Sequence, residues 1–361
     1  VKHSNFIVHL IHLRLGIPQQ VLIVIVVVDW GVPHHMIYKH SQNNCSGGIQ
    51  VRQSSDLNLL KNCKVFTGTI AISNVDDISD LIFNRLEHLE GTLDINDNRL
   101  LRHVSFPNLT SVTRIGIANQ TTLTKIEFPF LKQADALTFR QLAADVTFDS
   151  GLEFINNIEI SDTNIHELNG FNPKNVITIS INNNPFLREL KLDSLLKVDS
   201  LYVASNRNDG FSFEAQNLQT VKDLVIENVA SLSLPSLVSS NSNIALSNNN
   251  FSKLSIPKLD SISGTFAIKS NPELKKLDFP ELKNMGGALI ISENPKLLTI
   301  DGFPKLKRIN GVMDVTGSFS EFLMPELKEI RGGVNVETSD KRFDCDKKKI
   351  NSLKDYGIAK E

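Results

Sequence analysis

The sequence predicts a mainly β fold: a right-handed parallel β-solenoid of leucine-rich-like repeats with about 13 coils. Three stretches show the repeat most clearly, and they align residue by residue: 91–112, 264–285 and 287–309. Their shared frame is G-x-L-x-I-x-x-N-x-x-L-x-x-L-x-F-P-x-L-x-x-I. A period of about 22 residues with this frame is typical of solenoids, in which each short unit stacks on the next.

The L-x-I step predicts a short strand, because residues two apart point to the same side of a strand. Leu93 and Ile95, like Leu289 and Ile291, should therefore face the interior. Strands of this kind, stacked in parallel, would form one apolar column that runs through all the coils.

An Asn follows the strand and predicts a hydrogen-bonded ladder. Its amide carries two donors and one carbonyl acceptor, so it can bond turn backbone that would otherwise be buried unpaired. The position is occupied by Asn98, Asn184, Asn206, Asn249, Asn271 and Asn294, with Gln120 and Thr163 in weaker copies.

The F-P-x-L half of the repeat predicts a second corner. Proline fixes φ and donates no N–H, so it suits a point where the strand ladder is interrupted. The residue before it is mostly Phe, as at Phe106, Phe128, Phe279 and Phe303. With 20 Phe against three Tyr and one Trp, the composition indicates an interior column of stacked Phe rings.

The regularity of the repeat predicts four parts of the chain. Residues 1–40 do not match it, and their run Val21–Val28 is too short to span a bilayer but resembles the apolar part of a secretory signal. The repeat is clean at 91–130 and 224–335 and less regular between them, which predicts one solenoid over 41–208 and a second over 209–345. Residues 346–361 are charged and are interpreted as a cap or linker.

The composition favours an extracellular protein. The net charge is −2 and only 22% of residues are charged, so no basic surface invites nucleic acid. Four N-x-S/T sequons predict N-glycosylation at Asn44, Asn108, Asn119 and Asn250; the alternative is that these are plain turn asparagines.

The cysteines suggest a disulfide cap. Cys45 and Cys63 flank a stretch in which Ser54 or Ser55 could cap a short helix. A disulfide there would seal the first coil and would stabilise the fold by about 3 kcal/mol, whereas the alternative is a pair of reduced core thiols. Cys345 then has no partner in the chain, so it is either a free thiol or pairs beyond Glu361.

The residues favour a binding or structural protein over an enzyme. Polysaccharide-degrading enzymes built on solenoids need clustered carboxylates, but no Asp or Glu recurs here as a facing pair. Asp76 and Asp77 are interpreted as capping a helix that follows them. No nucleophile, zinc, phosphate or dinucleotide motif occurs, so we expect no catalytic, cofactor or metal site.

One aromatic residue is a candidate ligand contact. Tyr202 lies between Leu201 and Val203, at the position of the strand that should face outward. A single ring is a small platform for a sugar. Binding of glucan or chitin, and binding of a peptide by a receptor-type module, therefore remain alternatives to a purely structural role.

Several phrases resemble one family: F-P-x-L-x-x-I-x-G, I-S-D-T at 160–163, L-N-G-F at 168–171, and I-R-G-G-V-N-V-E-T-S-D-K-R-F-D-C at 330–345. They are similar to fungal GPI-anchored cell-wall proteins built on receptor L-domain repeats, a group that includes yeast sporulation-specific proteins. The resemblance covers about residues 45–345. By position, Cys45 and Cys63 match the family's N-terminal disulfide, and Cys345 matches the first Cys of its C-terminal cap.

The resemblance implies a secreted, N-glycosylated protein at the plasma membrane or in the wall, acting in wall organisation or ascospore-wall assembly. Its partners would be wall polysaccharide or other wall proteins. Relatives continue into a second Cys, a Ser-rich stalk and a hydrophobic GPI signal, which these 361 residues do not contain. Membrane attachment is therefore expected only through a GPI anchor that is not present in this chain.

Overall fold

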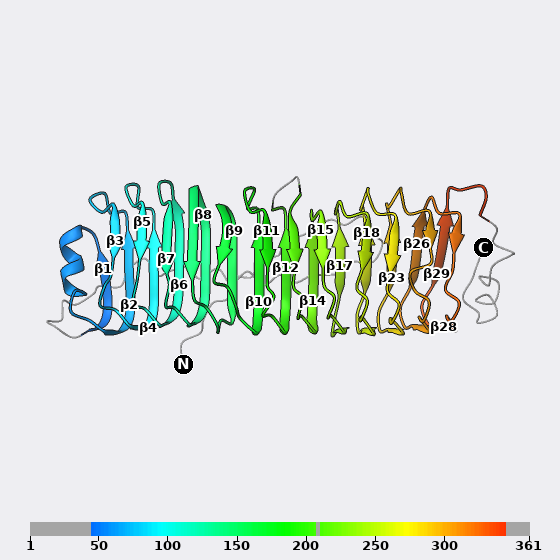
Figure 1. Ribbon diagram of the computed structural model, residues 1–361, viewed down its shortest axis with the longest axis horizontal. Coiled ribbons are helices and arrows are strands. Elements are labelled where there is room, and N and C mark those ends of the chain that lie inside the picture. Colours follow the sequence, from blue (N-terminus) through cyan, green and yellow to red (C-terminus); the bar gives the residue numbers. More distant parts are fainter. Residues whose placement is uncertain (1–44, 207–209, 344–361) are drawn as a thin grey trace, which may run out of the picture. The chain divides into compact units, whose positions relative to one another are not determined.

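The computed structural model describes residues 45–206 and 210–343. The predictions for residues 1–40, Asn44, Cys345 and 346–361 lie outside the described residues. The described chain is a parallel β-solenoid of about 13 coils, which confirms the predicted fold class. The strands of successive coils lie side by side in chain order (Figure 1).

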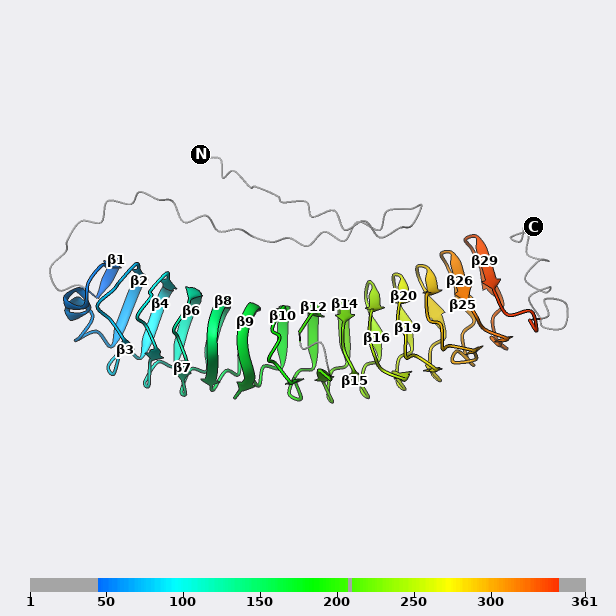
Figure 2. The same ribbon diagram turned by 90° about the horizontal axis from the view of Figure 1, so that it is seen from above.

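One strand from each coil builds the long sheet, on one side of the stack (Figure 2). These strands pair in parallel, each with the next: β1 (Ser46–Val51), β2 (Val65–Ser73), β4 (His88–Asn96), β6 (Ser111–Gln120), β8 (Gln133–Ser150), β9 (Asn157–Asn169), β10 (Asn175–Asn182), β12 (Lys197–Ala204), β14 (Thr220–Glu227), β17 (Ile244–Ser247), β20 (Phe266–Lys269), β23 (Leu289–Ser292), β26 (Met313–Gly317) and β29 (Val334–Thr338). From β17 onward, a separate two-residue strand precedes each of these long-sheet strands. These short strands are β16 (Ser239–Ser240), β19 (Ser261–Ile262), β22 (Asn284–Met285), β25 (Arg308–Ile309) and β28 (Glu329–Ile330).

Shorter strands form the other side of the coils. They are β3 (Asp80–Ile82), β5 (His103–Ser105), β7 (Lys125–Phe128), β11 (Glu189–Lys191), β13 (Ser212–Glu214), β15 (Ser231–Ser233), β18 (Lys253–Ser255), β21 (Lys276–Asp278), β24 (Thr299–Ile300) and β27 (Glu321–Phe322). β8 is long enough to pair with β6 at its start and with β7 at its end, so it runs through both sides.

Both predicted corners are hydrogen-bonded turns. At the proline corner the Leu109 N–H donates to Phe106 O (3.2 Å), so Pro107 occupies the second position of the turn, where its fixed φ is favourable. At the other corner Leu101 N–H donates to Asn98 O (3.4 Å). The repeat frame therefore encodes two turns per coil.

The interior contains the predicted aromatic column in segments. Phe106 stacks on Phe83 and Phe128, with ring centroids 4.8 and 5.4 Å away, and Phe279 stacks on Phe303 at 5.1 Å. These rings are buried, and offset stacking of this kind adds to the energy of burial.

The predicted amide ladder is also present. Asn271 lies between two coils: its Oδ1 accepts from Asn249 N–H (2.9 Å) and its Nδ2 donates to Leu246 O (3.2 Å). Asn294 repeats the arrangement one coil later. All eight predicted ladder residues are at most 3% exposed, so the amides satisfy turn backbone inside the core.

The N-terminal cap differs in detail from the prediction. The helix is a short 3₁₀ helix, η1 (Ser54–Leu59), and its N-cap is Gln53, not Ser54 or Ser55. The Asp56 carboxylate accepts the N–H groups of Arg52 (2.9 Å) and Gln53 (3.2 Å). Ser54 is already inside the helix, and the Asp56 carboxylate, three residues after the N-cap, binds the backbone that leads into the helix.

The helix expected after Asp76 and Asp77 is wrong, since the next element is strand β3. Asp77 instead accepts the N–H (2.9 Å) and hydroxyl (2.7 Å) of Ser54, one coil earlier. It therefore caps η1 across the coil boundary.

The predicted division at residue 208 falls at residues 207–209, outside the described part. The strands on either side, β12 and β14, pair directly with each other. Two separate solenoids, 41–208 and 209–345, remain a prediction.

Candidate functional site

The outward face of the long sheet is the most regular surface of the described chain. We define the outer row as the residues between the two buried positions of each L-x-I step, which pair strand to strand. They are Ala71, Asp94, Gly116, Thr138, Glu159, Ser180, Tyr202, Val225, Ala245, Ala267, Ile290, Asp314 and Asn335. Most are short side chains, and those from Val225 to Ile290 are all apolar.

Tyr202 is the one aromatic residue of the outer row. The structure places it on β12, facing outward between Ser180 and Val225 of the neighbouring strands. It is half-buried, and this burial raises the pKa of its phenol, with a further contribution from the nearby Glu227 carboxylate. The phenol therefore stays neutral, and the ring is only partly covered by its neighbours.

The three described sequons differ in accessibility. Asn108 and Asn250 are exposed, on turns. The Asn108 Nδ2 donates to Asn84 O (2.6 Å). Asn119 is partly buried within β6, and its Nδ2 donates to Asn96 Oδ1 (2.9 Å). An N-linked glycan is attached through Nδ2 and projects into solvent, so the exposed Asn250 and Asn108 are better placed than the partly buried Asn119.

Cys45 and Cys63 are joined by a disulfide in the structure, with Cα atoms 5.6 Å apart. The bond ties the start of β1 to the loop after η1. Cys63 and the adjacent core residues Val51 and Leu60 are at most 2% exposed. The N-terminal end of the core is therefore covered.

A charged cluster on the short strands went unnoticed in the sequence. The His103 ring lies between two carboxylates, with Nε2 2.7 Å from Glu127 Oε2 and Nδ1 3.6 Å from Asp80 Oδ1. A hydrogen bond from Lys125 is the main cause that lowers the pKa of Glu127, and His103 contributes less. The signal was available, since Asp80, His103 and Lys125 occupy equivalent repeat positions and Glu127 lies two residues further along its strand.

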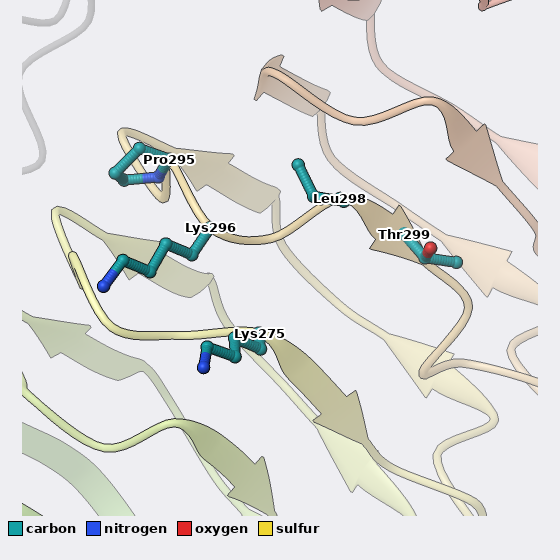
Figure 3. Close-up of a pocket in the computed structure, with 5 residues that line it drawn as sticks. All are labelled: Lys275, Pro295, Lys296, Leu298 and Thr299. Carbon is teal, nitrogen blue, oxygen red and sulfur yellow. The ribbon is translucent and has the colours of Figure 1, made fainter.

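Within residues 45–206 and 210–343, no group of three or more His, Cys, Asp or Glu could hold a metal ion. A hollow of about 410 Å³ lies on the turn side, lined by Lys275, Pro295, Lys296, Leu298 and Thr299 (Figure 3). The Lys296 ammonium is bound by both oxygens of Glu273, at 2.6 and 2.7 Å. The charge of Lys296 is therefore already neutralised within the protein.

Curated fungal proteins are similar to this chain over most of its length. Sporulation-specific protein 2 of Saccharomyces cerevisiae is 32% identical over 310 residues, 84% of this chain and 61% of that protein. Cell wall protein ecm33 of Schizosaccharomyces pombe is 30% identical over 309 residues, 84% of this chain and 73% of that protein. The chain belongs to this family of fungal cell-wall proteins.

A further member, the cell surface GPI-anchored protein ECM33 of Candida albicans, is 30% identical over 310 residues, covering 75% of its length. The chain thus spans 61% to 75% of these three family members. No model of a protein family matches the chain, and neither does any solved structure. In the described part of this family member, no helix is long and apolar enough to cross a membrane.

Proposed function

We propose that this protein is a non-enzymatic, secreted glycoprotein of the fungal cell surface that acts in cell-wall organisation. The observation that carries the proposal is its similarity to proteins named for the cell wall and for sporulation, over 84% of the chain. The fold supports it, because a solenoid offers long repetitive surfaces suited to scaffolding.

Finer features of the family are part of the proposal. The repeats are of the receptor L-domain type, arranged as two solenoids over 41–208 and 209–345. The protein acts in the vegetative wall or in ascospore-wall assembly, beside wall polysaccharide or other wall proteins. It is held at the outer face of the plasma membrane through a GPI anchor, a proposal that the name of the Candida albicans relative supports.

Two observations support the absence of catalysis. The outer row places Asp94, Glu159 and Asp314 far apart along the sheet, so no two carboxylates face one another there. The Glu159 carboxylate is also engaged by Arg140 through two bonds of 2.8 and 2.6 Å. A glycosidase needs a facing pair of free carboxyl groups.

The test is deletion of the gene in the fungus that carries it. Loss of a wall-organising protein should make cells or spores lyse faster in glucanase, and the reintroduced gene should restore resistance. A tagged copy should fractionate with the wall or the outer membrane surface. Unchanged lysis of both cells and spores, with the tagged protein inside the cell, would refute the proposal.

A receptor-type L-domain module that binds a peptide or a wall polysaccharide is the second candidate. It is favoured by Tyr202, whose half-buried ring adjoins the apolar outer-row residues from Val225 to Ile290. In a pull-down with glucan or chitin, the Tyr202→Ala variant should no longer bind the polysaccharide. Phe130→Ala is the control, because Phe130 is 59% exposed at a proline corner on another surface. If the polysaccharide retains both variants and the unaltered chain equally, Tyr202 has no role in binding it.

A further inference from the structure

The proline-type corners carry polar side chains on the outside, with one exception. Such a corner is a turn in which the N–H of the last residue donates to the carbonyl of the first, as from Leu131 to Phe128 (3.0 Å). Only Phe130 is apolar at the third position of the described corners closed in this way, and it is 59% exposed. The third residues are Asn108, Phe130, Ser194, Asn217, Ser236, Lys258, Glu281, Lys305 and Glu326.

Phe130 lies directly beside the sequon at Asn108. β5 pairs in register with β7, and the two corners that follow these strands have the same turn (Figure 1). After the corners, the Lys132 N–H donates to Thr110 O (2.9 Å), which keeps the same register. Asn108 and Phe130 are therefore equivalent positions of adjacent coils, whose backbones lie about 4.8 Å apart.

The Asn108 amide is held in a way that leaves a place for a glycan. Its Nδ2 has two hydrogens, and the bond to Asn84 O (2.6 Å), on the preceding coil, uses one of them. A glycosylated amide keeps one N–H, so this bond can persist when a sugar replaces the other hydrogen. Because the two N–H bonds of a planar amide diverge, the sugar would leave the amide away from Asn84.

The Phe130 ring has room for a sugar beside it. The next coil places Gly151 there, since an added Cβ would lie 2.9 Å from Pro129 O and 3.5 Å from Leu131 O, on either side of Phe130. Glycine has no side chain that could cover the ring. The C–H face of a pyranose and the face of a phenyl ring are both apolar, so their contact removes apolar surface from water.

We propose that the first N-acetylglucosamine of a glycan on Asn108 packs against the Phe130 ring of the neighbouring coil. The inference rests on the proposed function in one respect, that Asn108 is glycosylated. It makes the glycan a contact between two coils and explains an exposed Phe at a position that is otherwise polar. Phe106, two residues before Asn108, cannot provide this surface because it is 0% exposed.

The first test detects the contact itself. The protein is secreted from a fungal host, its glycans are trimmed to single isotope-labelled N-acetylglucosamine units, and their C–H resonances are recorded by NMR. The Phe130 ring should shift the resonances of one sugar upfield, and Asn108→Gln and Phe130→Ala should each abolish that shift. Phe130→Tyr should keep it, since the ring remains. Phe154→Ala is the matched control, because this ring is 63% exposed but lies beside Gln133, not beside a sequon.

The second test measures the coupling between glycan and ring as local stability. Asn108→Gln is compared in the unaltered chain and in Phe130→Ala, so the loss of the bond to Asn84 is the same in both. We expect Asn108→Gln to accelerate amide exchange in β5 and β7 about fivefold more when Phe130 is present, an effect of the size of one ring contact. Exchange in β20 and β23 should not change.

The outcomes separate this inference from the proposed function. A glycan on Asn108 whose resonances and exchange effect are the same with and without the Phe130 ring would overturn the inference alone. Absence of a glycan on Asn108 would overturn it too, and a glycan on Asn250 would then show that the protein is still a secreted glycoprotein.

Discussion

At the residue scale, the ladder depends on amides whose length matters. Asn98 Oδ1 accepts from Val75 N–H at 3.0 Å, and its Nδ2 donates to Ile72 O at 3.0 Å. Gln120, one methylene longer, keeps the donor side with bonds from Nε2 to Ala118 O and Ile95 O. Its buried Oε1 has no hydrogen-bond partner among the described residues. The slot is thus built for Asn.

Gln120→Asn should therefore stabilise the fold. Satisfying a buried acceptor is worth about 1–3 kcal/mol, whereas losing a buried methylene costs about 0.8 kcal/mol, so we expect a net gain of about 1 kcal/mol. Urea unfolding measures it. Gln120→Leu, which also removes the donor, is the control and should destabilise; a loss of stability in Gln120→Asn would contradict the ladder geometry.

Glycan occupancy is also decided at single residues. In a fungal secretory host, Asn108→Gln and Asn250→Gln should each remove one glycan mass from the purified protein. Asn119→Gln should leave the mass pattern unchanged, because Asn119 is partly buried within β6 whereas Asn108 and Asn250 are exposed. Intact mass before and after endoglycosidase treatment measures this, and a glycopeptide at Asn119 would contradict the assignment.

At the element scale, the turn after each long strand repeats one backbone conformation. The residue just before the ladder position has φ between 49° and 58° in eleven coils. Asn and Asp predominate there, since they tolerate this left-handed region better than most residues. The residues are Asn74, Asp97, Asn119, Gln141, Asp162, Asn183, Ser205, Asn228, Asn248, Ser270 and Glu293.

The glycine that opens the repeat frame reflects close approach of neighbouring coils. A Cβ added at Gly287 would lie 2.5 Å from the carbonyl carbon of Gly264, one coil earlier. Gly287→Ala should therefore force the coils apart and cost about 2–3 kcal/mol. Gly333→Ala is the matched control, since a Cβ there meets nothing within 4 Å. Thermal unfolding compares the two, and equal midpoints would refute the close approach.

The cap of η1 predicts a pH dependence. The Ser54 N–H and, second, the Ser54 hydroxyl lower the pKa of Asp77, so its contribution to stability is present above the unfolded-state pKa of about 4. That contribution is lost as the pH falls through the lower folded-state pKa. Asp77→Asn should therefore have a lower unfolding midpoint at pH 6, with a smaller difference at pH 3. A difference that does not change with pH would exclude the carboxylate as the cause.

At the scale of the whole molecule, stability should be local along the stack. Each coil contacts mainly its two neighbours, so repeat proteins unfold in segments and their ends open first. The N-terminal end is held by η1 and the disulfide, which closes a loop with a sequence separation of 18 residues.

Cys45→Ser with Cys63→Ser should loosen the N-terminal coils. The chain-entropy model assigns such a bond about 3 kcal/mol. Hydrogen exchange should accelerate in β1 and β2 and stay unchanged in β20 and β23. Uniform acceleration along the stack would show instead that the described coils unfold as one cooperative unit.

Repeated features could be predicted, and features that depend on one particular pair of coils could not. The ladder at Asn98, the stacked Phe106 and the outward Tyr202 follow from the repeat, because the same environment recurs in every coil. The Asp77–Ser54 contact joins residues 23 apart, and its register depends on the length of a single coil. The left-handed turn residues could have been found from the Asn, Asp and Ser that precede the ladder positions.

The sequence by itself determined the parallel solenoid, its two turns per coil, its amide ladder and its family likeness. These properties are local or periodic, so they are written in every copy of the repeat. Only the tertiary structure decided which sequon side chain is partly buried, which residues adjoin Tyr202 and which carboxylate caps η1. Those outcomes depend on the stacking of neighbouring coils, which brings together residues about 22 positions apart whose pairing no single repeat specifies.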